Sequence, residues 1–180
     1  MISLQQIVTE LDHDQDSHLA RILILLSAFD HPDVPALDGI TKLAKLDFLL
    51  RYPSFFERAM RERGVQDDRA KIETYERNSV EAQMVRYRFG PWDHKYRRFL
   101  NILTGMGLVR ILRQGRATTI SLTGKGRELA TRLSEQAVFQ TTKARAQLLK
   151  SKLDLTPTHI TKFIYETFPE VVSLSSNKPI

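Results

Sequence analysis

The chain has 180 residues, enough for one well-buried domain or for a domain with an added helical subdomain. Its 27 lysines and arginines outnumber its 21 acids, and this basic excess favours a polyanionic partner. The sequence has no cysteine, which excludes a disulfide framework and a thiolate metal site. The chain does not open on a signal-peptide pattern, and its apolar runs are shorter than the roughly 20 residues of a spanning helix. We therefore expect a cytoplasmic protein with no membrane partner.

The first 29 residues contain two groups of apolar residues at helical spacing. Residues 4–11 predict a short amphipathic helix, and residues 19–29 predict a central helix whose apolar surface is wider than one stripe. Between them, residues 12–18 place two histidines among three aspartates, which could indicate a metal site. We favour the other interpretation, in which Asp16 or Ser17 is the N-cap of the second helix.

Residues 30–79 continue the helical half of the chain. Residues 30–38 contain two prolines and predict a loop, and residues 39–51 predict a helix. We expect its face with Ile40, Leu43, Leu46 and Leu50 to point inward and Lys42, Lys45 and Asp47 to point outward. Pro53 should end this helix and Ser54 should cap a short one through Arg61. Residues 64–79 are polar and predict an exposed insertion between the helical half and the wing half, which could be partly helical.

In the stretch from Met84 to Arg127 the spacing of the apolar residues changes twice, from that of a strand to that of a helix and back. Residues 85–89 alternate between large apolar residues and arginine, which predicts a strand with one buried face. Gly90-Pro91 ends this strand, and from Trp92 the apolar residues follow helical spacing until Gly105. Residues 108–112 and 117–122 are then two β-rich runs, which predict a hairpin with arginines at its tip.

Strand, helix and hairpin in this order describe the second half of a winged helix-turn-helix domain. We therefore expect a mainly α protein with a small antiparallel β-wing and additional N- and C-terminal helices. Residues 1–130 would form the winged-helix domain, with its insertion at 64–79. Residues 131–180 would form a C-terminal helical arm.

The C-terminal arm is predicted from capping residues and apolar spacing. Thr123 should cap a helix that begins at Gly124, and a break is expected near residues 141–142. Thr156-Pro157 should begin a further helix, which Pro169 ends. The arm is too apolar to stand free, so it should pack on the core, on a second copy of the chain, or on another protein.

Motifs that would indicate catalysis or cofactor binding are missing from the sequence. The two Gly-x-Gly triplets, at 105–107 and 124–126, lack the spacing of a dinucleotide fingerprint or a phosphate-binding loop. The second is better explained as a turn that leads into a helix. We accordingly expect a protein that is not an enzyme and that has neither a cofactor nor a metal.

The predicted helix after Pro91 carries a basic face. A recognition helix in the DNA major groove needs hydrogen-bond donors opposite its apolar stripe, and a wing needs cations that reach phosphate. The predicted nucleic-acid-binding residues are Arg86, Arg88, His94, Lys95, Arg97, Arg98, Asn101, Arg113 and Arg116. The alternative is the solvated face of an ordinary amphipathic helix, since winged helices often serve as protein-interaction modules.

Two segments resemble a known family. They are residues 37–58, LDGITKLAKLDFLLRYPSFFER, and residues 79–109, SVEAQMVRYRFGPWDHKYRRFLNILTGMGLV. The phrases KLDFLLRYP and VRYRFGPWDHKY are the most diagnostic. With them, the chain resembles the middle component of the ABC-three component systems, which include Lamassu-type antiphage defence. The resemblance spans roughly residues 17 to 130.

The resemblance implies a small, non-enzymatic winged-helix subunit made alongside an SMC-like ATPase and an effector, often a nuclease. Such a subunit would bridge the ATPase and the effector, and its basic face could also touch double-stranded DNA. Arg86, Arg88, Trp92, Asp93 and Tyr96 would then mainly fix the junction between strand and helix.

Two other classes of protein remain open. One is a stand-alone, dimeric transcription regulator resembling the MarR or PadR groups, and the other is an antitoxin-like protein. A homodimer is therefore a further expected state of the chain.

Overall fold

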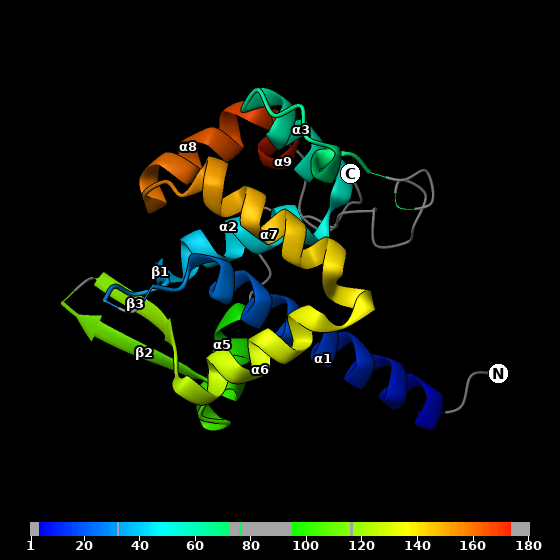
Figure 1. Ribbon diagram of the computed structural model, residues 1–180, viewed down its shortest axis with the longest axis vertical. Coiled ribbons are helices and arrows are strands. Elements are labelled where there is room, and N and C mark those ends of the chain that lie inside the picture. Colours follow the sequence, from blue (N-terminus) through cyan, green and yellow to red (C-terminus); the bar gives the residue numbers. More distant parts are fainter. Residues whose placement is uncertain (1–3, 32, 73–75, 77–94, 116, 174–180) are drawn as a thin grey trace.

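The computed structural model describes residues 4–31, 33–72, 76, 95–115 and 117–173. These residues form a mainly helical structure with a small three-stranded antiparallel sheet (Figure 1). The helices are α1 (Leu4–Phe29), α2 (Gly39–Arg51), α3 (Pro53–Glu62), α5 (Tyr96–Gly105), α6 (Gly124–Glu135), α7 (Gln140–Leu153), α8 (Pro157–Thr167) and α9 (Pro169–Ser173), with 3-10 turns η1 (Asp68–Ala70) and η3 (Ala137–Phe139). The strands are β1 (Leu37–Asp38), β2 (Val109–Gln114) and β3 (Ala117–Leu122).

Helix α1 runs without a break through residues 12–18, where two helices and a cap were expected. Asp16 and Ser17 are exposed residues inside the helix, so the prediction that one of them is an N-cap is wrong. Aspartate, histidine and serine each cost well under 1 kcal/mol in a helix interior, and this segment contains neither glycine nor proline. The packing of α1 against α6 and α7 outweighs such a cost.

Helix α2 occupies the centre of the molecule, and every residue from Lys42 to Leu50 is buried. The expectation that Lys42, Lys45 and Asp47 point outward is therefore wrong. Helices α1, α3, α5, α7 and α8 all contact α2, together with β1 and β3, so this stretch has no solvated face. Lys42 Nζ instead donates to Asp154 Oδ1 at 2.7 Å, and burial lowers the pKa of Lys45 to about 8.

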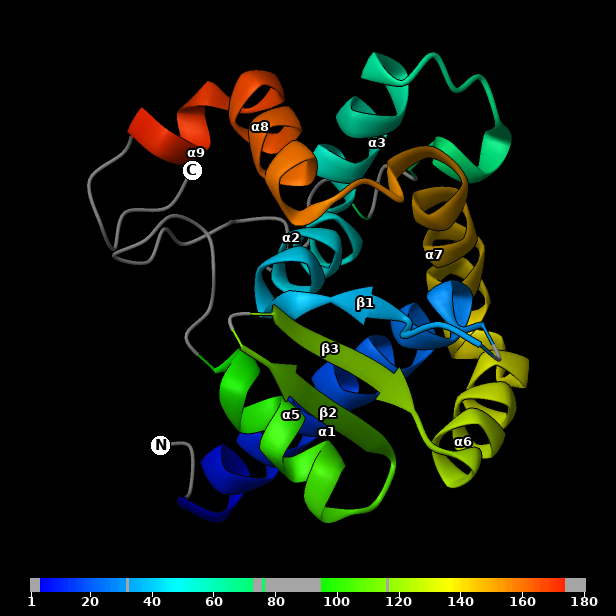
Figure 2. The ribbon, with the colours of Figure 1, turned by 90° about the vertical axis from the view of Figure 1, so that its left-hand side faces the viewer.

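The sheet has the strand order β1-β3-β2 (Figure 2). Strands β2 and β3 form the predicted hairpin, with Val109 opposite Leu122. Strand β1 pairs with β3 through Leu37 opposite Ile120, in a region that was expected to be a loop. A strand of two residues is too short to leave a period in the sequence, so its pairing comes from tertiary contact.

Two prolines begin helices that they were expected only to precede or end. Pro53 is the first residue of α3, with Tyr52 as N-cap in place of the predicted Ser54, and Pro169 is the first residue of α9. Proline suits the first helical turn because its missing N–H would have had no partner there. The chain therefore turns at each proline and continues as helix.

The polar insertion is partly packed against the body of the molecule. Ala70 and Ile72 are buried, and η1 contacts α3 and α7. Arg145 of α7, itself buried, donates to Glu76 from Nη1 at 2.7 Å and Nη2 at 2.9 Å. The prediction of an exposed insertion is thus wrong for residues 70 and 72. The predicted strand at 85–89 and the helix start at Trp92 lie outside the described residues.

The C-terminal helices pack on the core, the first of the three expected arrangements. Thr123 and Thr156 cap α6 and α8 through their side chains, as predicted. The chain breaks at 136–139, a few residues earlier than expected. Leu149, Ile160 and Phe168 belong to the same buried apolar cluster as α1 and α2.

Candidate nucleic-acid interface and its buried support

Helix α5 separates an apolar face from a basic one, as its sequence predicts. Arg97, Arg98 and Asn101 are exposed. On the other side, Tyr96, Phe99, Leu100 and Leu103 are buried. The helix contacts β2 and lies beside the hairpin (Figure 2), so donors of α5 and of the hairpin can share one surface.

The structure places five of the nine predicted binding residues. Lys95 immediately precedes α5 and is exposed, like Arg97, Arg98 and Asn101 on the helix. Arg113 is exposed on β2, and its Nε donates to the carbonyl of Gly115 at 3.2 Å. The other four, Arg86, Arg88, His94 and Arg116, lie outside the described residues.

Sequence reasoning missed one exposed arginine of the hairpin. Arg110 of β2 is exposed, between the buried Val109 and the partly buried Ile111. The alternation of these three residues could have identified it, because successive side chains of a strand point to opposite faces. The sequence prediction named only the arginines at the tip of the hairpin and did not consider those along its strands.

The side chains of the basic face differ in how they are held. Arg98 Nη2 donates to Gln15 Oε1 of α1 at 3.0 Å, so part of its hydrogen-bonding capacity is used within the molecule. Arg97 and Asn101 have no hydrogen-bond or ion-pair partner within the described part of the chain. These two side chains are therefore the ones on α5 most able to reach a ligand.

A buried ionic cluster fixes α5 from beneath. Asp47 of α2 is fully buried, and Arg21 of α1 donates to it from Nε at 2.6 Å and Nη2 at 3.1 Å. Tyr96 Oη of α5 donates to Asp47 Oδ2 at 2.5 Å. Hydrogen bonds to an ionised acceptor are about twice as strong as neutral ones. Asp47 therefore joins α1, α2 and α5 at one point.

A histidine extends this cluster beneath the apolar face of α5. Arg21 Nη2 lies 2.5 Å from His18 Nδ1, and the His18 ring stacks on Phe99 with centroids 5.1 Å apart. His18 itself is 3% exposed. The stacking of His18 on Phe99 is therefore a second contact between α1 and the buried face of α5.

The cluster sets the ionisation of its members. Burial raises the pKa of Asp47, but the charge of Arg21 and the hydrogen bonds from Arg21 and Tyr96 outweigh burial and hold that pKa below its ordinary value. Burial, and then the negative charge of Asp47, raises the pKa of Tyr96 well above its ordinary value of 10.0. At neutral pH the carboxylate is charged and the phenol keeps its proton, so the hydrogen bond between them is maintained.

The two sequence phrases quoted above meet in this cluster. Asp47 belongs to KLDFLLRYP and Tyr96 to VRYRFGPWDHKY, and 49 residues separate them along the chain. Neither phrase by itself predicts the contact, because a hydrogen bond between distant residues leaves no local pattern. Asp47 and Tyr96 hold helices in place beneath the basic face.

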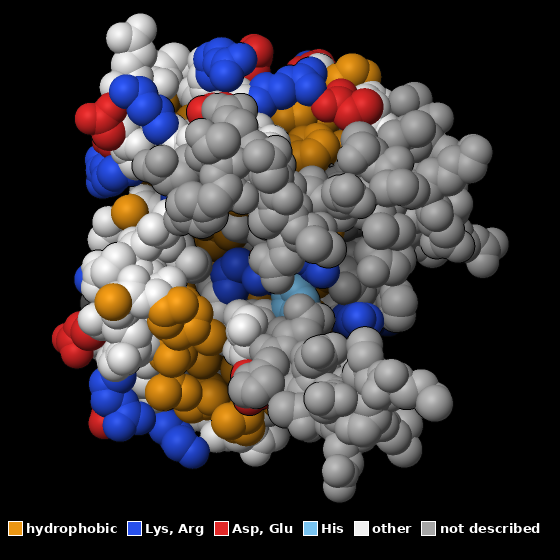
Figure 3. Space-filling model, turned by 90° about the vertical axis from the view of Figure 1, so that its right-hand side faces the viewer, with side chains coloured by type: hydrophobic (Ala, Val, Ile, Leu, Met, Phe, Trp, Pro, Cys, Tyr) orange, Lys and Arg blue, Asp and Glu red, His pale blue; other side chains and the backbone are white. Residues whose placement is uncertain are grey.

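The side of the molecule opposite that of Figure 2 has a different character. Figure 3 shows hydrophobic side chains gathered near the end of α6. Val138 of η3 is 77% exposed, and Leu129, Leu133 and Phe139 are partly buried. An apolar patch beside charged side chains suits contact with another protein.

The described residues were also searched for metal-binding clusters and for membrane spans. They contain no group of three histidine, cysteine, aspartate or glutamate side chains that could hold a metal ion. Among the helices in these ranges, none is both long and apolar enough to cross a membrane. Comparison of the chain with protein-family models, with curated proteins and with solved structures found no match.

Proposed function

We propose that the chain is a winged-helix protein. The element order α1-β1-α2-α5-β2-β3 supports this assignment, because a winged helix places its hairpin directly after its third helix. The strand order β1-β3-β2 supports it further, since the short first strand of a winged helix pairs with the last one. One feature departs from a minimal winged helix: α3 and η1 lie between α2 and α5, where a short turn would be usual.

We further propose that it is a non-enzymatic accessory subunit of an SMC-like ATPase complex. In this role it would bridge the ATPase and an effector such as a nuclease, and its basic face could touch double-stranded DNA. The observation that carries this proposal is the Tyr96–Asp47 hydrogen bond, which joins the two phrases that resemble the middle component of ABC-three component systems. In this proposal Tyr96 and Asp47 hold the helices of the subunit in place, and the partner proteins carry out catalysis.

Co-purification tests this proposal. The chain would be expressed with the long coiled-coil ATPase encoded by a neighbouring gene and captured on a tag. We expect the ATPase to remain bound in high salt, because apolar docking is not screened by ions. Absence of such a gene, or loss of the ATPase at low salt, would contradict the assignment.

A second candidate function is a stand-alone, dimeric DNA-binding regulator of MarR or PadR type. The observation that favours it is the exposed set Arg97, Arg98 and Asn101 on α5, together with exposed arginines at 110 and 113 on opposite faces of the neighbouring strand β2. A regulator would bind a palindromic operator, and its affinity would fall steeply as salt rises.

The basic face can be tested by reversing its charge. The double variant Arg97→Glu, Arg98→Glu should weaken duplex DNA binding about tenfold or more in an electrophoretic shift assay, because two phosphate-neutralising cations become anions. The matched control is Arg132→Glu with Lys152→Glu, which makes the same change of net charge at exposed positions of α6 and α7. Unchanged affinity of the α5 variant, with its circular dichroism retained, would contradict DNA contact through this face.

A further inference from the structure

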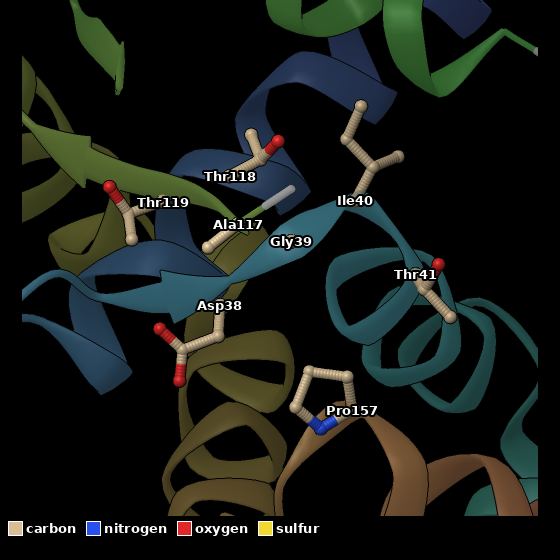
Figure 4. Close-up of a pocket in the computed structure, with 8 residues that line it drawn as sticks. All are labelled: Asp38, Gly39, Ile40, Thr41, Ala117, Thr118, Thr119 and Pro157. Carbon is tan, nitrogen blue, oxygen red and sulfur yellow. The ribbon is translucent and has the colours of Figure 1, made fainter. Parts of the chain in front are cut away.

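A pocket of about 430 Å³ opens where α2, β3 and α8 begin. Asp38, Gly39, Ile40 and Thr41 line one side, Ala117, Thr118 and Thr119 line another, and Pro157 closes the third (Figure 4). Gly39 has φ of +86°, a conformation that favours glycine and lets the chain turn from β1 into α2. The pocket thus depends on three segments that are far apart in the sequence.

Asp38 supplies the charge of this pocket. It is the N-cap residue of α2, yet its side chain makes no capping hydrogen bond, whereas Thr123 and Thr156 cap their helices. The Asp38 side chain is exposed, and within the described residues it has no ion-pair partner. Figure 4 shows it projecting from the end of β1 on the side where Pro157 lies. Its carboxylate is therefore available to a ligand.

The rest of the lining combines acceptor oxygens with apolar surface. The hydroxyl of Thr41 makes no hydrogen bond within the described ranges and can accept one, whereas the register Asp38 opposite Thr119 puts the Thr118 side chain on the other face of the sheet. Ala117 and Pro157 add apolar surface on the side of Asp38. One carboxylate, a hydroxyl acceptor and apolar surface suit a ligand with an aliphatic stem and a cationic head, since such side chains pack their stems on apolar surface.

An anionic ligand fits the pocket less well, although the N-termini of α2 and α8 both face it. Pro157 has no N–H, and the N–H of His159 donates to Thr156 Oγ1 at 3.3 Å, so α8 offers few free donors. The two helix N-termini carry about half a positive charge each, so they offset Asp38 at a distance, but a group that touches the carboxylate directly meets a full negative charge. The carboxylate would repel an anion.

We infer that this pocket receives a lysine or arginine side chain of a partner protein. Asp38 takes the cationic head, and Ala117 and Pro157 contact the methylene stem. The inference rests on the lining of the pocket and is independent of which assembly the chain joins.

Chemical-shift titration tests it, with N-acetyl-arginine methylamide and N-acetyl-lysine methylamide as probes. We expect saturable shifts of the amide signals of Gly39, Thr41 and Thr118, with a Kd on the order of millimolar. N-acetyl-norleucine methylamide has a neutral chain of similar length and should produce much smaller shifts. Equal shifts with the norleucine probe, or none with the cationic probes, would overturn the inference.

Two variants locate the binding. Asp38→Asn should raise the Kd of the cationic probes about two- to fivefold, which is the effect expected for the loss of one partly exposed ion pair. It should stay folded, because asparagine is an equally good N-cap residue. Asp33→Asn, an exposed acid outside the pocket, should bind like the wild type. Thr41→Leu should also weaken binding by narrowing the pocket. Wild-type affinity in both Asp38→Asn and Thr41→Leu would place the cation elsewhere and refute the assignment.

Discussion

Asp47 is the residue through which α1, α2 and α5 are tied together. Its carboxylate accepts hydrogen bonds from Arg21 and Tyr96 and is fully buried. Asp47→Asn removes the charge that compensates the guanidinium of Arg21, and we expect it to lower the free energy of unfolding by about 3 kcal/mol. Urea denaturation followed by circular dichroism measures this loss.

Asp33→Asn provides the matched control for that substitution. Asp33 is exposed, so its replacement should change stability by no more than about 0.5 kcal/mol. Equal effects of the two substitutions would mean that the buried cluster contributes nothing specific to the fold.

The cluster also predicts how stability changes with pH. The lowered pKa of Asp47 contributes stability that is present above the unfolded value of about 4 and is lost as the pH falls below it. The raised pKa of Tyr96 contributes stability that is present below pH 10 and is lost above it, because the unfolded phenol ionises first.

Tyr96→Phe separates the alkaline effect from that of the other tyrosines. Below pH 9 we expect this variant to be about 2 kcal/mol less stable than the wild type, since it lacks a hydrogen bond to a buried carboxylate. Above pH 10 the difference should shrink, because only the wild type loses the contribution of Tyr96. Unfolding free energies measured from pH 7 to 11 would give parallel curves if the phenol were not buried against Asp47.

At the scale of elements, the start of α6 depends on one close approach of two backbones. A Cβ atom added to Gly126 would lie 2.0 Å from the carbonyl oxygen of Leu108, whereas one added to Gly124 would have no neighbour within 4 Å. The Leu108 carbonyl also accepts the N–H of Thr123 at 3.0 Å, so it cannot move freely.

Two glycine substitutions therefore have opposite expected outcomes. Gly126→Ala should lower the free energy of unfolding by about 1–3 kcal/mol through overpacking, as thermal or urea unfolding would show. Gly124→Ala should be neutral or stabilising by up to about 1 kcal/mol. Comparable stability of the two variants would contradict the close packing of the start of α6 on Leu108, the residue before β2.

Local signals predicted the elements that have local causes. Thr123 and Thr156 cap helices, and the hairpin follows from two β-rich runs separated by turn residues. The continuity of α1 was missed because an aspartate-rich segment is equally compatible with a cap and with a helix interior. Packing against α6 and α7 decides between them.

Local patterns in the sequence predicted the exposed face of the candidate site but not the buried contacts beneath it. Apolar spacing located the exposed face of α5, but the burial of Asp47 depends on Arg21 and Tyr96, which lie 26 and 49 residues away. The burial of Lys42 likewise depends on Asp154, 112 residues away. Contacts between residues so far apart in the sequence leave no periodic pattern. Lys42 and Asp47, whose spacing predicted an outward-facing position, are therefore buried in the structure.

At the scale of the whole molecule, the described residues offer two surfaces to partners besides the pocket at Asp38. Helix α5 and strand β2, which carry the exposed arginines, lie on the side shown in Figure 2, and an apolar patch lies on the opposite side, shown in Figure 3. The buried core continues from α1 through α8, so both surfaces are mounted on one packed body. Such an arrangement would let a bridging subunit hold two partners at a fixed separation.

The mass of the assembly tests the proposed bridging role most directly. The chain would be expressed with its neighbouring ATPase and effector, purified through a tag on the chain in high salt, and measured by native mass spectrometry. We predict a particle that contains all three proteins. A mass equal to one or two copies of the chain alone, with salt-sensitive binding to a palindromic duplex, would contradict the bridging role and favour the regulator.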